Sequence, residues 1–133
     1  MPAIYSPKDV TVIVNGEYIT GFAEGTFVTI EKDEDSISPS VGAQGDVAVA
    51  ISCNNLHSAT FILQQTSPSV ATLDRLHKAG NMFTVSVTCK SKDGSIDESF
   101  DCESALVKKP ATRNYSNEIE SREYSIQCLD GYL

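Results

Sequence analysis

Apolar and polar residues alternate along most of this chain, which is the pattern of half-buried β-strands. Turn residues separate the alternating stretches, and Asn15-Gly16 and Asp93-Gly94 are dipeptides typical of tight hairpins. The pattern predicts strands at residues 9–15, 17–20, 26–32, 45–53, 58–65, 82–90, 95–102, 104–108 and 118–129. About eight or nine strands at this spacing indicate a mainly β fold of two packed antiparallel sheets, a β-sandwich or half-barrel.

One stretch has helical periodicity instead. Residues 69–79 place Val70, Leu73 and Leu76 on one side of a helix, and Gly80 follows as a stop signal. Ser69 is the candidate N-cap. We expect this single α-helix to flank a sheet, with its apolar stripe packed on it.

The strands at 26–32 and 45–53 are expected to form a pair with an unusually long connection. Residues 33–44 are polar, are punctuated by Pro39 and Gly42, and are too many for a tight hairpin turn. In the second strand Val47, Val49 and Ile51 share one face, and small or polar residues occupy the other. A strand pair with an extended tip often reaches something outside its own core. The pattern therefore indicates a subunit that assembles.

Composition and charge narrow the possible partners. The chain has 133 residues, which indicates one domain, and 18 acidic against 10 basic residues give a net charge of -8. Such a surface repels nucleic-acid phosphates, so tight DNA binding is not expected. No apolar run is long enough to span a bilayer, and the first ten residues lack the features of a secretory signal. We therefore expect folding in the cytoplasm, with reduced cysteines.

The residues do not suggest catalysis, a metal or a cofactor. His57 and His77 are the only histidines, no serine lies in a nucleophile elbow, and tryptophan is absent. The cysteines lack CxxC spacing and are expected to serve as small hydrophobes in strands; they are Cys53, Cys89, Cys102 and Cys128. Four carboxylates on one strand are best explained as a solvated acidic face: Asp97, Glu98, Asp101 and Glu103. We predict a protein that is not an enzyme.

Five short motifs, in this order and spacing, carry a family resemblance. They are ITGFAEGTF (19–27), EKDEDS (31–36), VGAQGDVA (41–48), LQQTSPS (63–69) and SREYSIQC (121–128). With them the chain resembles the tail tube proteins of contractile-tailed bacteriophages, and more narrowly a family of small phage structural proteins. The resemblance extends over nearly the whole chain.

This resemblance implies a single tail-tube domain over residues 1–133 and a place in the virion tail, after assembly in the host cytoplasm. Members of the family form hexameric rings that stack into a hollow tube, with neighbouring sheets joined into a barrel around the channel. The implied partners are further copies of the chain, the tail sheath, baseplate and tail terminator proteins, while the tape measure protein and DNA pass through the lumen. An extended loop or hairpin around 31–47 would contact neighbouring subunits; the candidate residues are Glu31, Asp33, Glu34, Asp35, Ser36, Val41, Gly42 and Gly45.

A DNA conduit must not bind its cargo, so negative and small polar side chains suit its wall. The candidates for the lumen lie on the polar faces of the expected strand pair: Thr29, Glu31, Asp33, Asp46, Ala48 and Ala50. The opposite face remains open as the lumen if the helix packs on this one. The acidic row of Asp97, Asp101 and Glu103 is a candidate contact for the sheath.

Two other functional classes stay open at this point. One is the tube of a tailocin or another contractile injection system, which genomic neighbours would distinguish. The other is a monomeric β-sandwich binding module, for example for carbohydrate. The absence of tryptophan disfavours the module, and a sizing column would separate it from a polymerising subunit.

Overall fold

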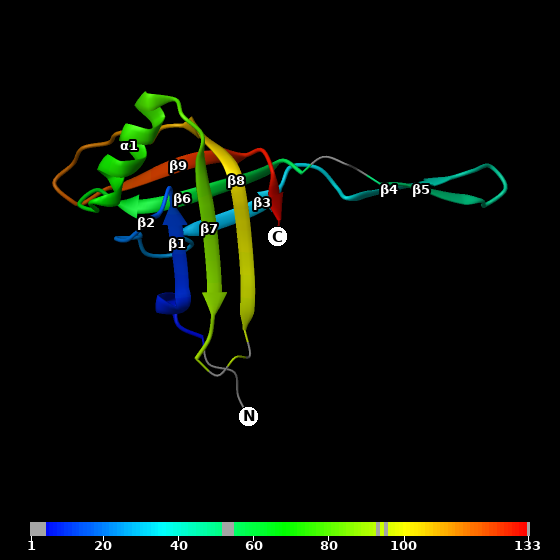
Figure 1. The fold of residues 1–133 in the computed structure, drawn as a ribbon, viewed down its shortest axis with the longest axis horizontal. Coiled ribbons are helices and arrows are strands. Elements are labelled where there is room, and N and C mark those ends of the chain that lie inside the picture. Colours follow the sequence, from blue (N-terminus) through cyan, green and yellow to red (C-terminus); the bar gives the residue numbers. More distant parts are fainter. Residues whose placement is uncertain (1–4, 52–54, 93, 95, 133) are drawn as a thin grey trace.

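A computed structural model describes residues 5–51, 55–92, 94 and 96–132. Within these residues ten strands accompany one α-helix and one short 3-10 helix (Figure 1). The helices are η1 (Pro7–Asp9) and α1 (Ser69–Ala79). The strands are β1 (Val10–Val14), β2 (Glu17–Tyr18), β3 (Val28–Lys32), β4 (Ile37–Val41), β5 (Val47–Ile51), β6 (His57–Gln64), β7 (Phe83–Lys90), β8 (Asp97–Lys109), β9 (Ser121–Cys128) and β10 (Gly131–Tyr132).

All strands except β4 and β5 belong to one antiparallel sheet. Its order is β2-β1-β7-β8-β9-β6-β3, and β10 pairs with β8. The long strand β8 pairs with β7 along its first part and with β9 along its last, and each pairing contains a register shift. Bulges of this kind bend a strand, and β1 and β7 run across the direction of β6 and β9 (Figure 1). The prediction of a mainly β half-barrel with one flanking helix is confirmed; its two layers are halves of one sheet.

The expected pairing of residues 26–32 with 45–53 is wrong. β3 pairs with β6, from Val28 opposite Phe61 to Lys32 opposite His57. β5 pairs with β4, a strand that lies inside the predicted polar connection. Alternation showed which side chains share a face, but it carries no information about which strand lies alongside.

The core lies between the two halves of the sheet and under α1. Alternate residues of β6, β7 and β9 are buried in it, as the period of two predicts, including Phe61, Val85 and Tyr124. Cys102 and Cys128 are also buried there, and burial raises the pKa of the Cys128 thiol to about 12. These two cysteines therefore act as small hydrophobes, as expected; Cys53 lies outside the described residues.

The helix begins and ends where the sequence predicts, but Ser69 is not its N-cap. Pro68 occupies that position without a side-chain cap, and the Ser67 hydroxyl instead accepts a hydrogen bond from the Ser69 N–H at 3.2 Å. The Ser69 hydroxyl accepts one from the Thr20 N–H at 3.0 Å, which joins the helix to the chain after β2. At the other end Gly80 adopts a left-handed φ of 68° that a side chain would strain.

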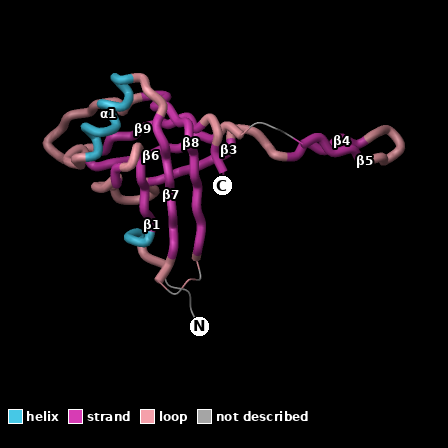
Figure 2. The backbone as a smooth tube through the Cα atoms, viewed as in Figure 1, coloured by secondary structure: helices cyan, strands magenta, loops and turns pink. Residues whose placement is uncertain are grey.

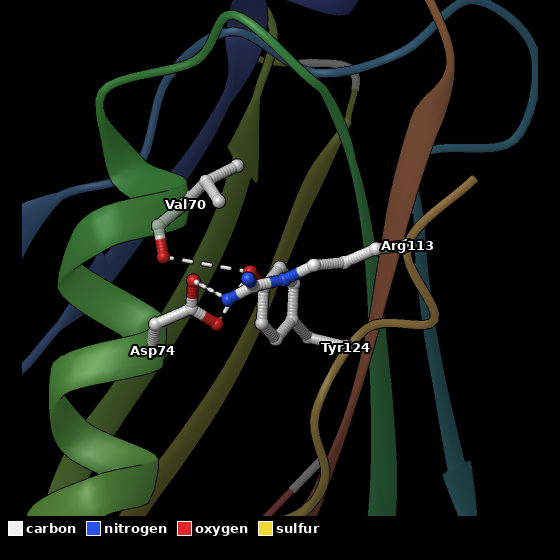
Figure 3. A network of polar contacts seen from close by, with 4 residues as sticks. All are labelled: Val70, Asp74, Arg113 and Tyr124. Carbon is white, nitrogen blue, oxygen red and sulfur yellow. Dashed lines mark hydrogen bonds and ion pairs between the residues drawn. The ribbon is translucent and has the colours of Figure 1, made fainter. Parts of the chain in front are cut away.

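A polar network fixes α1 to β9 (Figure 3). The Tyr124 hydroxyl points at the helix and donates to Asp74 Oδ1 at 2.9 Å. Arg113, in the connection between β8 and β9, approaches Asp74 Oδ2 at 3.6 Å. Burial, with the neighbouring Asp74 carboxylate, raises the pKa of Tyr124, so the hydroxyl stays protonated and remains a donor.

Replacing Tyr124 by phenylalanine is expected to lower the free energy of unfolding by about 1–2 kcal/mol, because the Asp74 carboxylate loses its donor in a half-buried position. Urea denaturation followed by circular dichroism measures this. Ser125→Ala, at the next position and on the opposite face, is the matched control and should stay within about 0.5 kcal/mol of the native chain. Equal losses in the two variants would contradict the role of the network.

Candidate assembly surface

The most distinctive feature of the molecule is the β4–β5 hairpin, which projects well beyond the large sheet (Figures 1 and 2). The two strands form a separate sheet from Ile37 opposite Ile51 to Val41 opposite Val47. The loop at the tip is closed by hydrogen bonds from the Gly42 N–H to the Asp46 carbonyl at 2.7 Å and from the Gly45 N–H to the Gly42 carbonyl at 3.0 Å. Every residue of both strands is exposed.

The register gives this hairpin two faces of opposite character. Residues directly opposite each other in an antiparallel pair project to the same side, so the pairs sort into two sets. One face, called here the apolar face, consists of Ile37, Pro39, Val41, Val47, Val49 and Ile51. The other, called here the small face, consists of Ser38, Ser40, Ala48 and Ala50.

The apolar face is suited to being covered. Its isoleucine and valine side chains are between 57% and 78% exposed. Burying one such side chain fully stabilises by roughly 1.5–3 kcal/mol, and an isolated two-stranded hairpin is only marginally stable in water. Contiguous exposed apolar surface of this kind marks an interaction site. Because Pro39 has no N–H to offer an added strand at the edge of β4, the side chains of the apolar face are the better means of contact.

The base of the hairpin is tied to the large sheet at Asp33. The Asp33 N–H donates to the Leu56 carbonyl at 3.0 Å. Its carboxylate accepts hydrogen bonds from the Ser58 hydroxyl at 2.5 Å and from Gln127 Nε2 at 3.0 Å. These two bonds, the one from Ser58 first, hold the pKa of Asp33 below its ordinary value. The start of the projection is thereby held to both β6 and β9.

This attachment is expected to depend on pH. Because the pKa of Asp33 is lower in the folded chain than its ordinary value of 3.8, its stabilising contribution is complete above that value and is lost as the pH falls through the folded pKa. Carbon-detected NMR titration of the Asp33 carboxylate measures the shift. Ser58→Ala should bring the pKa of Asp33 back toward 3.8, whereas Thr60→Ala, two residues along the same strand and outside this network, should not; equal pKa values in both variants would contradict the attachment.

The structure separates the residues predicted for the inter-subunit element. Glu31 lies within β3, and Asp33 lies at the base of the hairpin. Glu34, Asp35 and Ser36 follow in the exposed segment that leads to β4. Val41 ends β4, and Gly42 and Gly45 lie in the loop at the tip.

The lumen candidates are distributed over β3 and the hairpin. Thr29 and Glu31 lie on the solvent face of β3, whereas Ala48 and Ala50 lie on the small face of the hairpin and Asp46 lies at its tip. Ile37 and Pro39, two of the six residues of the apolar face, were not predicted from the sequence. These two residues alternate with Ser38 and Ser40, which is a pattern typical of a strand. A proline within such a run argues against a strand, and the sequence therefore predicts a loop for this segment.

Both ends of the large sheet are open in the described part of the chain. β3 pairs with β6 on one side only. At the other end β2 pairs with Ile13 and Val14, and the Ile19 N–H donates to the Val12 carbonyl at 2.9 Å, which leaves the start of β1 as an edge. Open edges are templates for pairing with another chain.

The chain is similar in sequence to a phage protein and in fold to solved structures from contractile injection systems. No protein-family model matches the sequence. Structural protein ORF10 of Pseudomonas phage KPP10 is 27% identical over 139 aligned residues, covering 95% of this chain and 78% of the phage protein. Two solved structures share the fold at 11% identity. The tube-terminating cap of the anti-feeding prophage has a TM-score of 0.67, covering 99% of this chain and 91% of that chain. A chain of the PVC extracellular contractile injection system, in its extended sheath–tube complex, has a TM-score of 0.62, covering 97% and 90%.

Proposed function

We propose that this chain, which has the tail-tube fold of contractile injection systems, is a structural virion protein that polymerises into the inner tube of a contractile phage tail. The observation that carries the proposal is the projecting hairpin with one apolar face, on a sheet whose two edges are open. These three surfaces have no partner in the described part of the single chain. They are available for contacts with subunits of the same ring and of adjacent rings.

The proposed assembly is a stack of hexameric rings. Contact between different surfaces of identical subunits closes a ring when the rotation permits it. The open edge of β3 on one subunit and that of β1 on the next are the surfaces through which a sheet could continue around the ring and lose its edges. The hairpin extends too far from the sheet to be covered by its own subunit and is proposed to bridge to neighbouring copies (Figure 2).

For the lumen we propose the solvent face of β3, β6 and β9. Thr29 lies opposite Thr60, which lies opposite Ser125, so small hydroxyl side chains cross all three strands in one row. Glu31 adds negative charge beside this row. Such a wall lets DNA and a tape measure protein pass without binding. The small face of the hairpin, with Ala48 and Ala50, and Asp46 at its tip would extend the wall. A tube reconstruction with these side chains turned toward the sheath would contradict this assignment.

For the sheath we propose the exposed acidic row of Asp97, Asp101 and Glu103 on β8. Baseplate and terminator proteins would contact the two ends of the tube. Charge reversal of the row, with unchanged tube formation but loss of sheath binding, is the outcome that supports this contact.

A second candidate is a tube terminator. The tube-terminating cap is a slightly better structural match than the sheath–tube chain, with a TM-score of 0.67 against 0.62. The tube of a tailocin or another injection system also has this fold, and the presence or absence of capsid and terminase genes nearby separates it from a phage tail.

Antibody labelling of tails with contracted sheaths tests the proposal. Gold particles along the whole exposed tube are expected. Label confined to one end would identify a terminator, and absence of the protein from purified tails would contradict both roles.

A further inference from the structure

A cleft of about 630 Å³ lies between β3 and the half of the sheet formed by β1, β7 and β8. β3 contributes Val28 and Ile30 to it, and the crossing half of the sheet contributes Val10, Val87 and Phe100. Tyr5, which is 54% exposed, also lines it. No residue of the hairpin is among the residues that line the cleft. The molecule thus carries an apolar projection and a separate recess whose wall is partly apolar, with Thr26, Glu98 and Ser99 among its polar residues.

We propose that the apolar face of the hairpin of one copy occupies this cleft in another copy. The proposal rests on the proposed function, because it names the surface that receives the hairpin when the chain polymerises. It goes further by assigning the receiving site to the core-facing side of β3 and β1, next to the two open edges of the sheet.

Charge favours this pairing over other contacts between two copies. Each copy carries a net charge of -8, so most of their surfaces repel one another. The hairpin strands and the loop between them contain a single charged residue, Asp46, which lies outside the apolar face. Among the described residues that line the cleft, Glu98 alone is charged. Contact between these two surfaces therefore brings two acidic copies together with little repulsion.

The arrangement of the two surfaces on the chain suits a polymer. Because the hairpin and the cleft are different surfaces of one chain, a contact between them can repeat from copy to copy. Face-to-face packing of two hairpins would instead end at a dimer and leave the cleft open.

Cysteine cross-linking tests this contact with a thiol that the chain already has. Cys89 lines the cleft and is partly exposed, whereas Cys102 and Cys128 are buried. The test uses Val49→Cys in a Cys53→Ser background, a short bis-maleimide, and sedimentation to confirm that the protein has assembled. A ladder of covalent oligomers is expected on a denaturing gel, with mass spectrometry locating the link between position 49 and Cys89.

Two controls make the result specific. Ala48→Cys presents the thiol on the small face and should form at least about tenfold less of the link to Cys89. Adding Cys89→Ser should remove the ladder. If the background variant assembles but position 49 links to another position 49, or forms no link to Cys89, the cleft is not the receiving site. A small apolar ligand retained in the cleft in native mass spectrometry of assembled protein would also overturn the inference. A background variant that stays monomeric at all concentrations would instead contradict the proposed function itself.

Discussion

Val49→Asp is expected to raise the critical concentration for polymerisation at least about 100-fold, while the monomer stays as stable as the native chain. Val49 is in the middle of the apolar face, opposite Pro39, and is 57% exposed in the single chain. A carboxylate at this position is solvated in the monomer but loses water without a partner once the face is covered, which costs several kcal/mol. A tenfold change in the critical concentration corresponds to about 1.4 kcal/mol. A desolvation cost of about 2.8 kcal/mol is therefore enough for the 100-fold effect.

The matched control is Ala50→Asp, which introduces the same charge one residue away on the small face. It is expected to polymerise within a few-fold of the native concentration dependence, because this face is proposed to remain solvated. Sedimentation velocity over a concentration series measures assembly, and thermal unfolding of dilute protein checks that both monomers are equally stable. Assembly of Val49→Asp at the native concentration would contradict the role of the apolar face.

Phe61→Ala is expected to lower the stability of the folded subunit, whereas Val49→Asp affects its assembly. Phe61 is fully buried in β6, lies opposite Tyr124 of β9 and is among the largest side chains of the core. Removing it leaves a cavity between the two halves of the sheet and should lower the free energy of unfolding by about 3–5 kcal/mol.

Urea denaturation of dilute protein measures this loss, and Thr60→Ala, the neighbouring position on the solvent face, provides the comparison. The control is expected to change the free energy of unfolding by no more than about 0.5 kcal/mol. A loss below 1 kcal/mol for Phe61→Ala would mean that the core does not lie between these strands. Together with Val49→Asp, this pair separates defects of folding from defects of assembly.

The parts of the fold that the sequence predicts are those that depend on local periodicity. Leu73 and Leu76 recur at helical spacing before Gly80, and the helix has the predicted bounds. Phe61 and Leu63 alternate with solvent-facing residues in the predicted strand 58–65, and Tyr124 and Ile126 do so in the predicted strand 118–129; all four side chains are buried. In each case the spacing of apolar residues within one segment is sufficient to predict the type of element that the segment forms.

The parts that the sequence does not predict depend on contacts between distant residues. The partner of β5 is decided by the short segment Ile37–Val41, where Pro39 reads as a break in a strand. Asp33 is held by Gln127, which is 94 residues further along the chain, so no local pattern marks it as the base of the hairpin. The cleft is built by β3 together with β1, β7 and β8, and exists only once the sheet has bent over.

The most direct test of the proposed assembly is a cryo-EM reconstruction of polymer grown from the purified protein. The expected result is a hollow tube of stacked six-fold rings, with the sheet continuous between neighbours in a ring and the β4–β5 hairpin of each subunit covered by another copy. Protein that remains monomeric at every concentration, or a tube in which the apolar face of the hairpin stays exposed to solvent, would contradict it.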